Sequence, residues 1–156
     1  MVWGLVVAVL AVTLDQVSKF YMINDVLDGH SEIILAPFFS LVRAWNKGVS
    51  FSLFNDWGEN GAYVISGFAA TVVLLLLWWM HKEKTKVAQI GLGLIIGGAI
   101  GNIADRIRFG AVFDFLDFHI GEYHWPAFNA ADSFICVGAA LVIMSELLKN
   151  RKEEKK

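Results

Sequence analysis

Residues Ala62–Met80 read AYVISGFAATVVLLLLWWM and carry no charged side chain anywhere along the stretch. A helix of about 20 mostly apolar residues is long enough to cross the hydrocarbon core of a bilayer. Three further stretches are long and apolar enough to do the same: Val2–Tyr21, Ala88–Ile107 and Ala130–Leu148. The composition agrees, because 56% of the 156 residues are hydrophobic and the mean hydropathy is +0.55. The sequence therefore predicts an all-α membrane protein with four transmembrane helices in one domain, residues 1–150.

The first apolar stretch shares its position with a secretory signal peptide but lacks the other features of one. No basic residue precedes it, whereas a signal peptide begins with a positively charged region. Asp15 and Lys19 also stand where a cleavage region would be small and neutral. We therefore expect this stretch to be retained as a membrane helix.

Lysine and arginine are unevenly distributed among the segments outside the four stretches. The long connector Met22–Gly61 carries only Arg43 and Lys47 against five acidic residues. The short second connector and the C-terminal tail are basic, with Lys82, Lys84, Lys86, Lys149, Arg151, Lys152, Lys155 and Lys156. Since basic loops stay on the cytoplasmic side, we expect both termini inside and the long connector outside. The tail, residues 151–156, is almost wholly charged, and we expect it to be a disordered cytoplasmic segment.

The outer connectors also contain short segments with a preference for strands. Phe38–Val42 and Val49–Phe54 flank a turn-like Asn46-Lys47-Gly48, which predicts a small β-hairpin in the outer loop between helices 1 and 2. Phe113–Ile120, between the third and fourth helices, mixes acidic with large apolar residues. We expect that segment to lie along the membrane surface.

Polar residues gather at one end of the predicted helices. An unpaired ionisable residue inside a span is unfavourable by about 2.5–3.5 kcal/mol, so each one requires a reason. These residues belong to helices 1, 3 and 4 and to the last connector: Asp15, Lys19, Asn102, Asp105, Arg106, Asp114, Asn129 and Asp132. Because consecutive helices run in opposite directions, we expect these groups at one depth, near the outer face of the membrane.

Helical spacing places some of these polar residues on common faces. Asn102 lies three positions before Asp105 and four before Arg106, and Asp15 lies four before Lys19, so each set can interact along its helix. A local ion pair that anchors a helix end explains Asp15 and Lys19 as well as a catalytic role does. Asp105 with Arg106 is open to the same structural interpretation.

The acids Asp114 and Asp132 favour a functional interpretation more strongly. An acid just inside a span, near another acid and with asparagine and arginine close by, is typical of a functional site.

The glycines at 93, 97 and 101 predict a helix-packing surface, because a ridge of small residues lets another helix approach closely.

The sequence also argues against several classes of function. The single cysteine, Cys136, can form neither an internal disulfide nor a redox pair. The four histidines are scattered without the spacing of a metal-binding motif, so we expect no metal and no cofactor. We interpret His119 and His124 as loop or interfacial residues and Asp117 as solvated. No basic stripe indicates nucleic acid as a partner.

Two non-catalytic interpretations remain open. Intramembrane acids occur in proton- or ion-coupled transporters, but a transport path requires polar groups across the whole bilayer, and Glu146 is the one acid in the inner halves of the predicted helices. In the other interpretation, the charged residues only lock the helices of a scaffold together. A scaffold predicts that Asp-to-Asn changes harm assembly and abolish no separable activity.

Five motifs occur in order along the chain. They read Asp15-Gln16-Val17-Ser18-Lys19, Asn46-Lys47-Gly48-Val49-Ser50-Phe51, Gly101-Asn102-Ile103-Ala104-Asp105-Arg106, Gly110-Ala111-Val112-Phe113-Asp114-Phe115 and Phe128-Asn129-Ala130-Ala131-Asp132. Over residues 10–148 the chain resembles lipoprotein signal peptidase (signal peptidase II), the bacterial membrane aspartic peptidase. The family patterns are D-x-x-x-K, N-x-G-x-[SA]-[FW], G-N-x-x-D-R, G-x-V-x-D-F and F-N-x-A-D. One such motif alone is weak, but five in order on a chain with four spans are specific.

The resemblance implies a membrane aspartic endopeptidase with Asp114 and Asp132 as its catalytic dyad and no metal. Its substrates are prolipoproteins whose lipobox cysteine carries a diacylglyceryl group, and cleavage occurs on the amino side of that cysteine. The residues implied in substrate binding or support are Asp15, Lys19, Asn46, Gly48, Asn102, Asp105, Arg106 and Asn129, with Asp105 expected to hold Arg106. The implied location is the bacterial cytoplasmic (inner) membrane, among membrane lipids, with the active site near the outer face. Nothing in the sequence demands more than a monomer.

Overall fold

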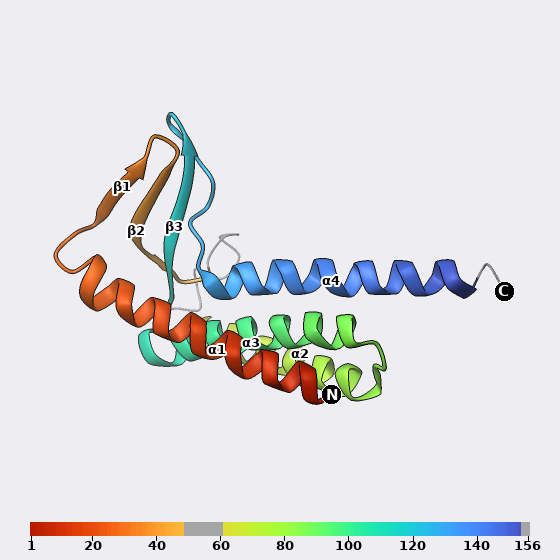
Figure 1. Cartoon of the computed structure of the whole chain (residues 1–156). Coiled ribbons are helices and arrows are strands. Elements are labelled where there is room, and N and C mark those ends of the chain that lie inside the picture. The colour runs from red at the N-terminus through yellow and green to blue at the C-terminus, as the bar shows by residue number, and fades with distance from the viewer. Residues whose placement is uncertain (49–60, 154–156) are drawn as a thin grey trace.

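The computed structural model describes residues 1–48 and 61–153. Figure 1 shows four helices running alongside one another, with the strands gathered at one end and the start of α1 and the end of α4 at the other. The elements follow in the order α1 (Val2–Tyr21), the π-helical turn η1 (Met22–Val26), β1 (Glu32–Ala36), β2 (Phe39–Asn46), α2 (Gly61–Lys82), α3 (Lys86–Phe109), β3 (Val112–Ile120), β4 (Tyr123–His124) and α4 (Ala130–Glu153).

The four α-helices correspond to the four apolar stretches of the sequence. Each is long and apolar enough to cross a membrane. The most buried of them is α3, which packs against α1, α2 and α4. Large apolar side chains such as Val9, Phe68 and Leu74 are exposed on the outside of the bundle, as in helices that are apolar all round and face lipid. The prediction of four helices capable of spanning a membrane is confirmed.

Glycines on one face of α3 let α1 approach closely. A Cβ atom added to any of three glycines would collide with α1: Gly93 with Gly4, Gly97 with Ala8 and Ala11, and Gly101 with Asp15. The predicted ridge of small residues is therefore confirmed, and the helix that packs on it is α1.

Replacement of Gly97 by alanine is expected to destabilise the bundle by about 1–3 kcal/mol, as overpacking of a filled interior does. The added Cβ would lie 2.6 Å from both the Ala8 carbonyl oxygen and the Ala11 Cβ. Thermal unfolding in detergent measures the effect. Gly67→Ala in α2 is the matched control, because nothing lies within 4 Å of a Cβ at that position. Equal unfolding temperatures for the two variants would contradict the close packing of α1 on α3.

The strands form one antiparallel sheet in the order β1-β2-β3-β4. The pairing of β2 with β3 joins the loop between α1 and α2 to the loop between α3 and α4, with Phe39 opposite Phe118 and Asn46 opposite Val112. A small apolar core anchors the sheet and consists of Leu27, Leu41, Phe113 and Phe115. The sheet therefore fixes these two loops to each other beside the ends of the helices.

The sheet bears on two details of the sequence prediction. Strand β2 pairs with β1 and with β3. The predicted hairpin of Phe38–Val42 with Val49–Phe54 stays a prediction, because Val49–Phe54 lies outside the described residues. Phe113–Ile120 forms most of strand β3, and its position relative to the membrane surface stays a prediction.

At the C-terminus, α4 continues to Glu153. The helix thus extends into residues 151–153, for which we predicted disorder. Residues 154–156 of the predicted tail lie outside the described residues.

Candidate active site

The polar ends of α1, α3 and α4 meet at the end of the bundle that carries the sheet. One network of hydrogen bonds and ion pairs connects residues from these helices and from β3: Asp15, Lys19, Asn102, Asp105, Asp114, Asn129 and Asp132. The predicted convergence of these groups at one depth is confirmed.

Asp114 enters this network from β3 and is almost fully buried, with 2% of its surface exposed. β2 is irregular between Leu41 and Ala44, just before Ala44 pairs with Asp114, and such bulges commonly redirect side chains next to active sites. The Nδ2 of Asn129 donates a 2.7 Å hydrogen bond to Asp114 Oδ1. Burial, with the charge of Asp132 as a second cause, raises the pKa of Asp114 from 3.8 to about 6, although hydrogen bonds from Asn46 and Asn129 oppose the shift.

Asp132 lies in the first turn of α4, where it forms a reciprocal cap with Asn129. The Asp132 amide donates to Asn129 Oδ1 at 3.0 Å, and the Asn129 amide donates to Asp132 Oδ2 at 3.1 Å, which is the pattern of a capping box. The other carboxylate oxygen, Oδ1, accepts a 2.9 Å bond from Asn102 Nδ2. The cap fixes the Asp132 side chain at the point where Asn129 also binds Asp114.

Asn129 therefore joins the two acids directly. Its backbone amide binds one carboxylate and its side-chain amide binds the other. Asp114 is buried, whereas Asp132 is partly exposed. One residue thus holds both carboxyl groups in the same hydrogen-bonded cluster.

Lys19 of α1 contacts the same network from within the helical bundle. Its Nζ forms ion pairs of 2.9 Å with Asp15 and 2.8 Å with Asp105, and it donates to Asn102 Oδ1 at 3.1 Å. The predicted pair of Asp15 with Lys19 is confirmed, and all three charged side chains are buried.

The two acids bound by Lys19 also bind backbone amides of the elements that carry Asp114 and Asp132. Asp15 Oδ1 accepts from the Ala131 amide at 3.0 Å, at the start of α4. Asp105 Oδ2 accepts from the Phe113 amide at 3.2 Å, next to Asp114. The lysine and its two acids thereby connect α1 and α3 to both elements that carry the acids of the site.

Arg106 does not pair with Asp105 as expected. Asp105 binds Lys19 and the amide of Gln16. Arg106 forms no ion pair within the described part of the chain, and its buried Nε has no hydrogen-bond partner there. Consecutive helical residues do not face each other, so Asp105 and Arg106 point toward different neighbours.

Asn46 and Gly48 form a tight turn at the end of β2. The Gly48 amide donates to Asn46 Oδ1 at 2.8 Å, and Gly48 adopts a positive φ of 77°, which favours glycine. This bond occupies the oxygen of the Asn46 amide. A hydrogen bond from the same side chain to Asp114 partly opposes the rise in the pKa of Asp114. The remaining residues of the motif, Val49–Phe51, lie outside the described residues.

Gln16 belongs to the network but was not predicted. Its Nε2 lies within hydrogen-bonding distance of Asp15 Oδ2, the Gly101 carbonyl oxygen and Asp105 Oδ1, at 3.1, 3.2 and 2.9 Å. Its position inside the stretch Asp15–Lys19 was a signal for it. The i,i+4 spacing identifies only the two charged residues, Asp15 and Lys19, and an uncharged glutamine between them carries no comparable signal.

A second group of titratable side chains lies outside this network. The Asp117 carboxylate contacts the Nδ1 atoms of His119 and His124. Asp117 is 5% exposed, so the expectation that it is solvated is wrong. One ligand atom from each of the three residues lies within 4.8 Å of the others, a geometry that could hold a metal ion.

Comparisons with known proteins agree with the resemblance noted in the sequence. A family model described as signal peptidase (SPase) II matches residues 7–148. The lipoprotein signal peptidase of Anaplasma phagocytophilum (strain HZ) is 42% identical over 146 residues, which cover 94% of this chain and 92% of that protein. The lipoprotein signal peptidase of Paraburkholderia phymatum is 44% identical over 147 residues, covering 93% and 87%.

A solved structure described as a bacterial membrane enzyme superposes with a TM-score of 0.77 at 26% identity, over 98% of this chain and 92% of the other. A second structure of the same description gives a TM-score of 0.72 at 28% identity, over 92% of both chains. These similarities lend no support to the transporter interpretation. The family match spans most of the chain, and the two relatives exceed 40% identity over nearly their whole length, so the chain belongs to the signal peptidase II family.

Proposed function

We propose that this chain is an aspartic endopeptidase that removes signal peptides from diacylglyceryl-modified prolipoproteins, cleaving on the amino side of the lipidated cysteine. Membership of the signal peptidase II family supports the class of reaction and substrate. The observation that carries the assignment of Asp114 and Asp132 as the dyad is that Asn129 binds both carboxylates. Only two acids held in one network can share a proton and a water.

The reaction needs no acyl-enzyme and no metal. The ionised member of the dyad removes a proton from water as that water attacks the scissile carbonyl carbon, and the protonated member donates to the carbonyl oxygen. Collapse of the tetrahedral intermediate breaks the C–N bond, and a proton goes to the departing cysteine amine. A pKa of about 6 for Asp114 supports this, because it favours retention of the proton on the pair. The proposal assigns the role of base to the pair and not to either acid alone.

The remaining polar residues support the dyad or the substrate. Asn102 and Asn129 orient the two carboxylates, and the Lys19 network holds their helices in place. The Nε of Arg106, which has no hydrogen-bond partner among residues 1–48 and 61–153, is a donor for a substrate carbonyl. Asn46, with its turn at Gly48, positions the first outer loop beside Asp114.

In the proposed setting the protein lies in the bacterial inner membrane as a monomer. The basic second connector and tail support cytoplasmic termini, which puts the sheet and the site near the outer face. The signal helix and acyl chains of the substrate enter from the lipid between the helices.

A diacylglyceryl-modified precursor incubated with the purified protein tests the proposal. We expect mass spectrometry to show a product that begins with the lipidated cysteine, and an unlipidated precursor of the same sequence to remain intact. Equal cleavage of both precursors would refute the requirement for lipid. If neither is cleaved, the peptidase assignment fails.

A further inference from the structure

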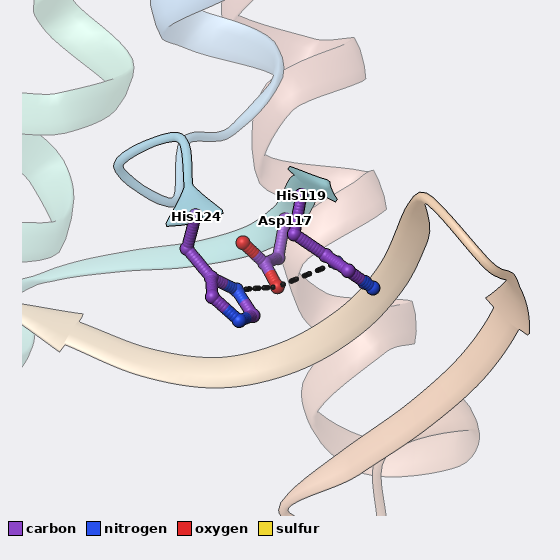
Figure 2. Close-up of side chains that lie close together, drawn as sticks. All are labelled: Asp117, His119 and His124. Atoms are coloured by element: carbon purple, nitrogen blue, oxygen red, sulfur yellow. Dashed lines mark hydrogen bonds and ion pairs between the residues drawn. The ribbon is translucent and has the colours of Figure 1, made fainter. Parts of the chain in front are cut away.

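At the outer tip of the sheet, Asp117 and His119 of β3 meet His124 of β4. Figure 2 shows the two imidazole rings on either side of the Asp117 carboxylate, each directed to the same oxygen. The rings stack with centroids 4.8 Å apart and planes inclined by 25°. Two imidazoles and a carboxylate are the ligand types that divalent transition metals such as Zn²⁺ prefer.

The spacing of the donor atoms fits one bound ion. Asp117 Oδ2 lies 3.3 Å from His119 Nδ1 and 2.8 Å from His124 Nδ1. Two ligands bound at about 2.0–2.1 Å in a tetrahedral site lie roughly 3.3 Å apart. The two carboxylate–imidazole distances are at or just below this value, and all three ligand atoms lie within 4.8 Å of one another, so small side-chain rotations can bring them around one ion.

Unsatisfied polar atoms at the same place also indicate a missing ligand. His119 Nδ1 is buried and has no hydrogen-bond partner among the described residues, since its 3.3 Å approach to Asp117 lacks hydrogen-bond geometry. Ser40, which pairs with Asp117 across the sheet, is buried, and its Oγ has no partner in the described chain. A cation would use the His119 lone pair and balance the buried charge of Asp117.

An ion can reach this position from outside. The side chain of His124 is 52% exposed, and a cleft of about 540 Å³ opens beside both histidines, lined by Phe38, Phe118, His119, Ile120, Tyr123, His124 and Trp125. Water from the cleft can fill the fourth coordination position, as in zinc sites with three protein ligands.

We propose that Asp117, His119 and His124 form a binding site for one Zn²⁺-class divalent metal ion, which fastens β4 to β3. The ion is separate from the dyad, because Asp117 follows Asp114 by three residues, about 10 Å along a strand. The segment after β4 runs back beside β3 through bonds such as Trp125 N to the Phe118 oxygen, and then reaches Asn129. The metal thus stabilises the loop between the two acids and takes no part in the chemistry.

The test uses the full chain, free of any affinity tag, stripped with a chelator and dialysed against ZnCl₂. We expect one Zn²⁺ per chain by elemental analysis and a higher unfolding temperature when zinc is present. His124→Ala should weaken zinc binding by about tenfold or more, since even indirect partners of metal ligands contribute 10–100-fold. His30→Ala and His81→Ala are the controls, because both histidines are exposed and lie outside the cluster.

Two further variants keep the result decisive. His119→Ala should also lose zinc and its thermal effect, whereas Asp114→Asn combined with Asp132→Asn should still bind one ion, which excludes the dyad as the metal site. Zinc bound equally by His124→Ala, by His119→Ala and by the unchanged chain would overturn the proposal. An unchanged chain that binds no zinc would equally overturn it, leaving the cluster as a set of hydrogen-bonded side chains.

Discussion

Asp114→Asn and Asp132→Asn are each expected to lower kcat for a lipidated precursor by about 10³-fold or more while the protein remains folded. General acid and base catalysis by one group contributes about 10²–10⁴-fold, and each change removes one of the two carboxyl groups that the proposed mechanism requires. Asparagine neither accepts a proton from water nor supplies one to the carbonyl oxygen. Single-turnover cleavage in detergent or liposomes measures the loss.

Stability distinguishes this catalytic explanation from a scaffold of interlocked charges. Burial raises the pKa of Asp114 to about 6, above the 3.8 of an unfolded chain, so the ionised carboxylate destabilises the native state. The stability that the protonated form provides is present below about pH 4 and is lost as pH rises through 6. At pH 7 the neutral asparagine of Asp114→Asn can still accept a hydrogen bond from Asn129. The unfolding temperature of this variant should therefore equal or exceed that of the unchanged chain. A scaffold predicts a lower one.

Asp28→Asn is the control for these variants, because Asp28 is an exposed acid in the loop between α1 and α2, outside the network. It should retain full activity and full stability. Near-normal cleavage by either Asp114→Asn or Asp132→Asn would remove that residue from the dyad.

The helices could be predicted from sequence because their signal is local. An apolar run of sufficient length spans a bilayer whatever its neighbours are, and all four runs proved to be helices. The sheet could not be predicted in the same way. β2 and β3 are about 70 residues apart along the chain, with Asn46 opposite Val112, and no local pattern in either segment specifies that register. The short strand Glu32–Ala36 is defined by its pairing with β2, and its own sequence does not predict a strand.

The same distinction explains what was predicted of the site. Helix direction alone placed Asp15, Asn102 and Asp132 at one depth, and the structure joins them in one network. The choice of partner depends on which way each side chain points across the gap between helices. Asp105 therefore binds Lys19 of α1, and not its sequence neighbour Arg106. Asp117 meets His124 only because β4 folds back on β3.

Lys19→Met is expected to be the most destabilising single change in the helical bundle, by about 3–5 kcal/mol. The substitution preserves most of the side-chain volume but removes the cation that neutralises two buried acids, Asp15 and Asp105. Loss of one member of a buried charge network leaves the others desolvated and unpaired. Thermal unfolding in detergent measures the effect, and Lys84→Met is the matched control because Lys84 is exposed on the short connector.

A double variant separates this electrostatic cause from a simple loss of packing. Asp105→Asn removes one of the two orphaned charges, and its side-chain oxygen can still accept from the Phe113 amide. Lys19→Met combined with Asp105→Asn should therefore be more stable than Lys19→Met alone, a coupling that double-mutant cycles detect between residues in contact. If the two changes simply add, Lys19 acts through its methylene chain and the charge network does not hold the helices. If the coupling is found, the ion pairs secure α1 to α3, and Asp15 and Asp105 then hold the Ala131 and Phe113 amides in place beside the dyad.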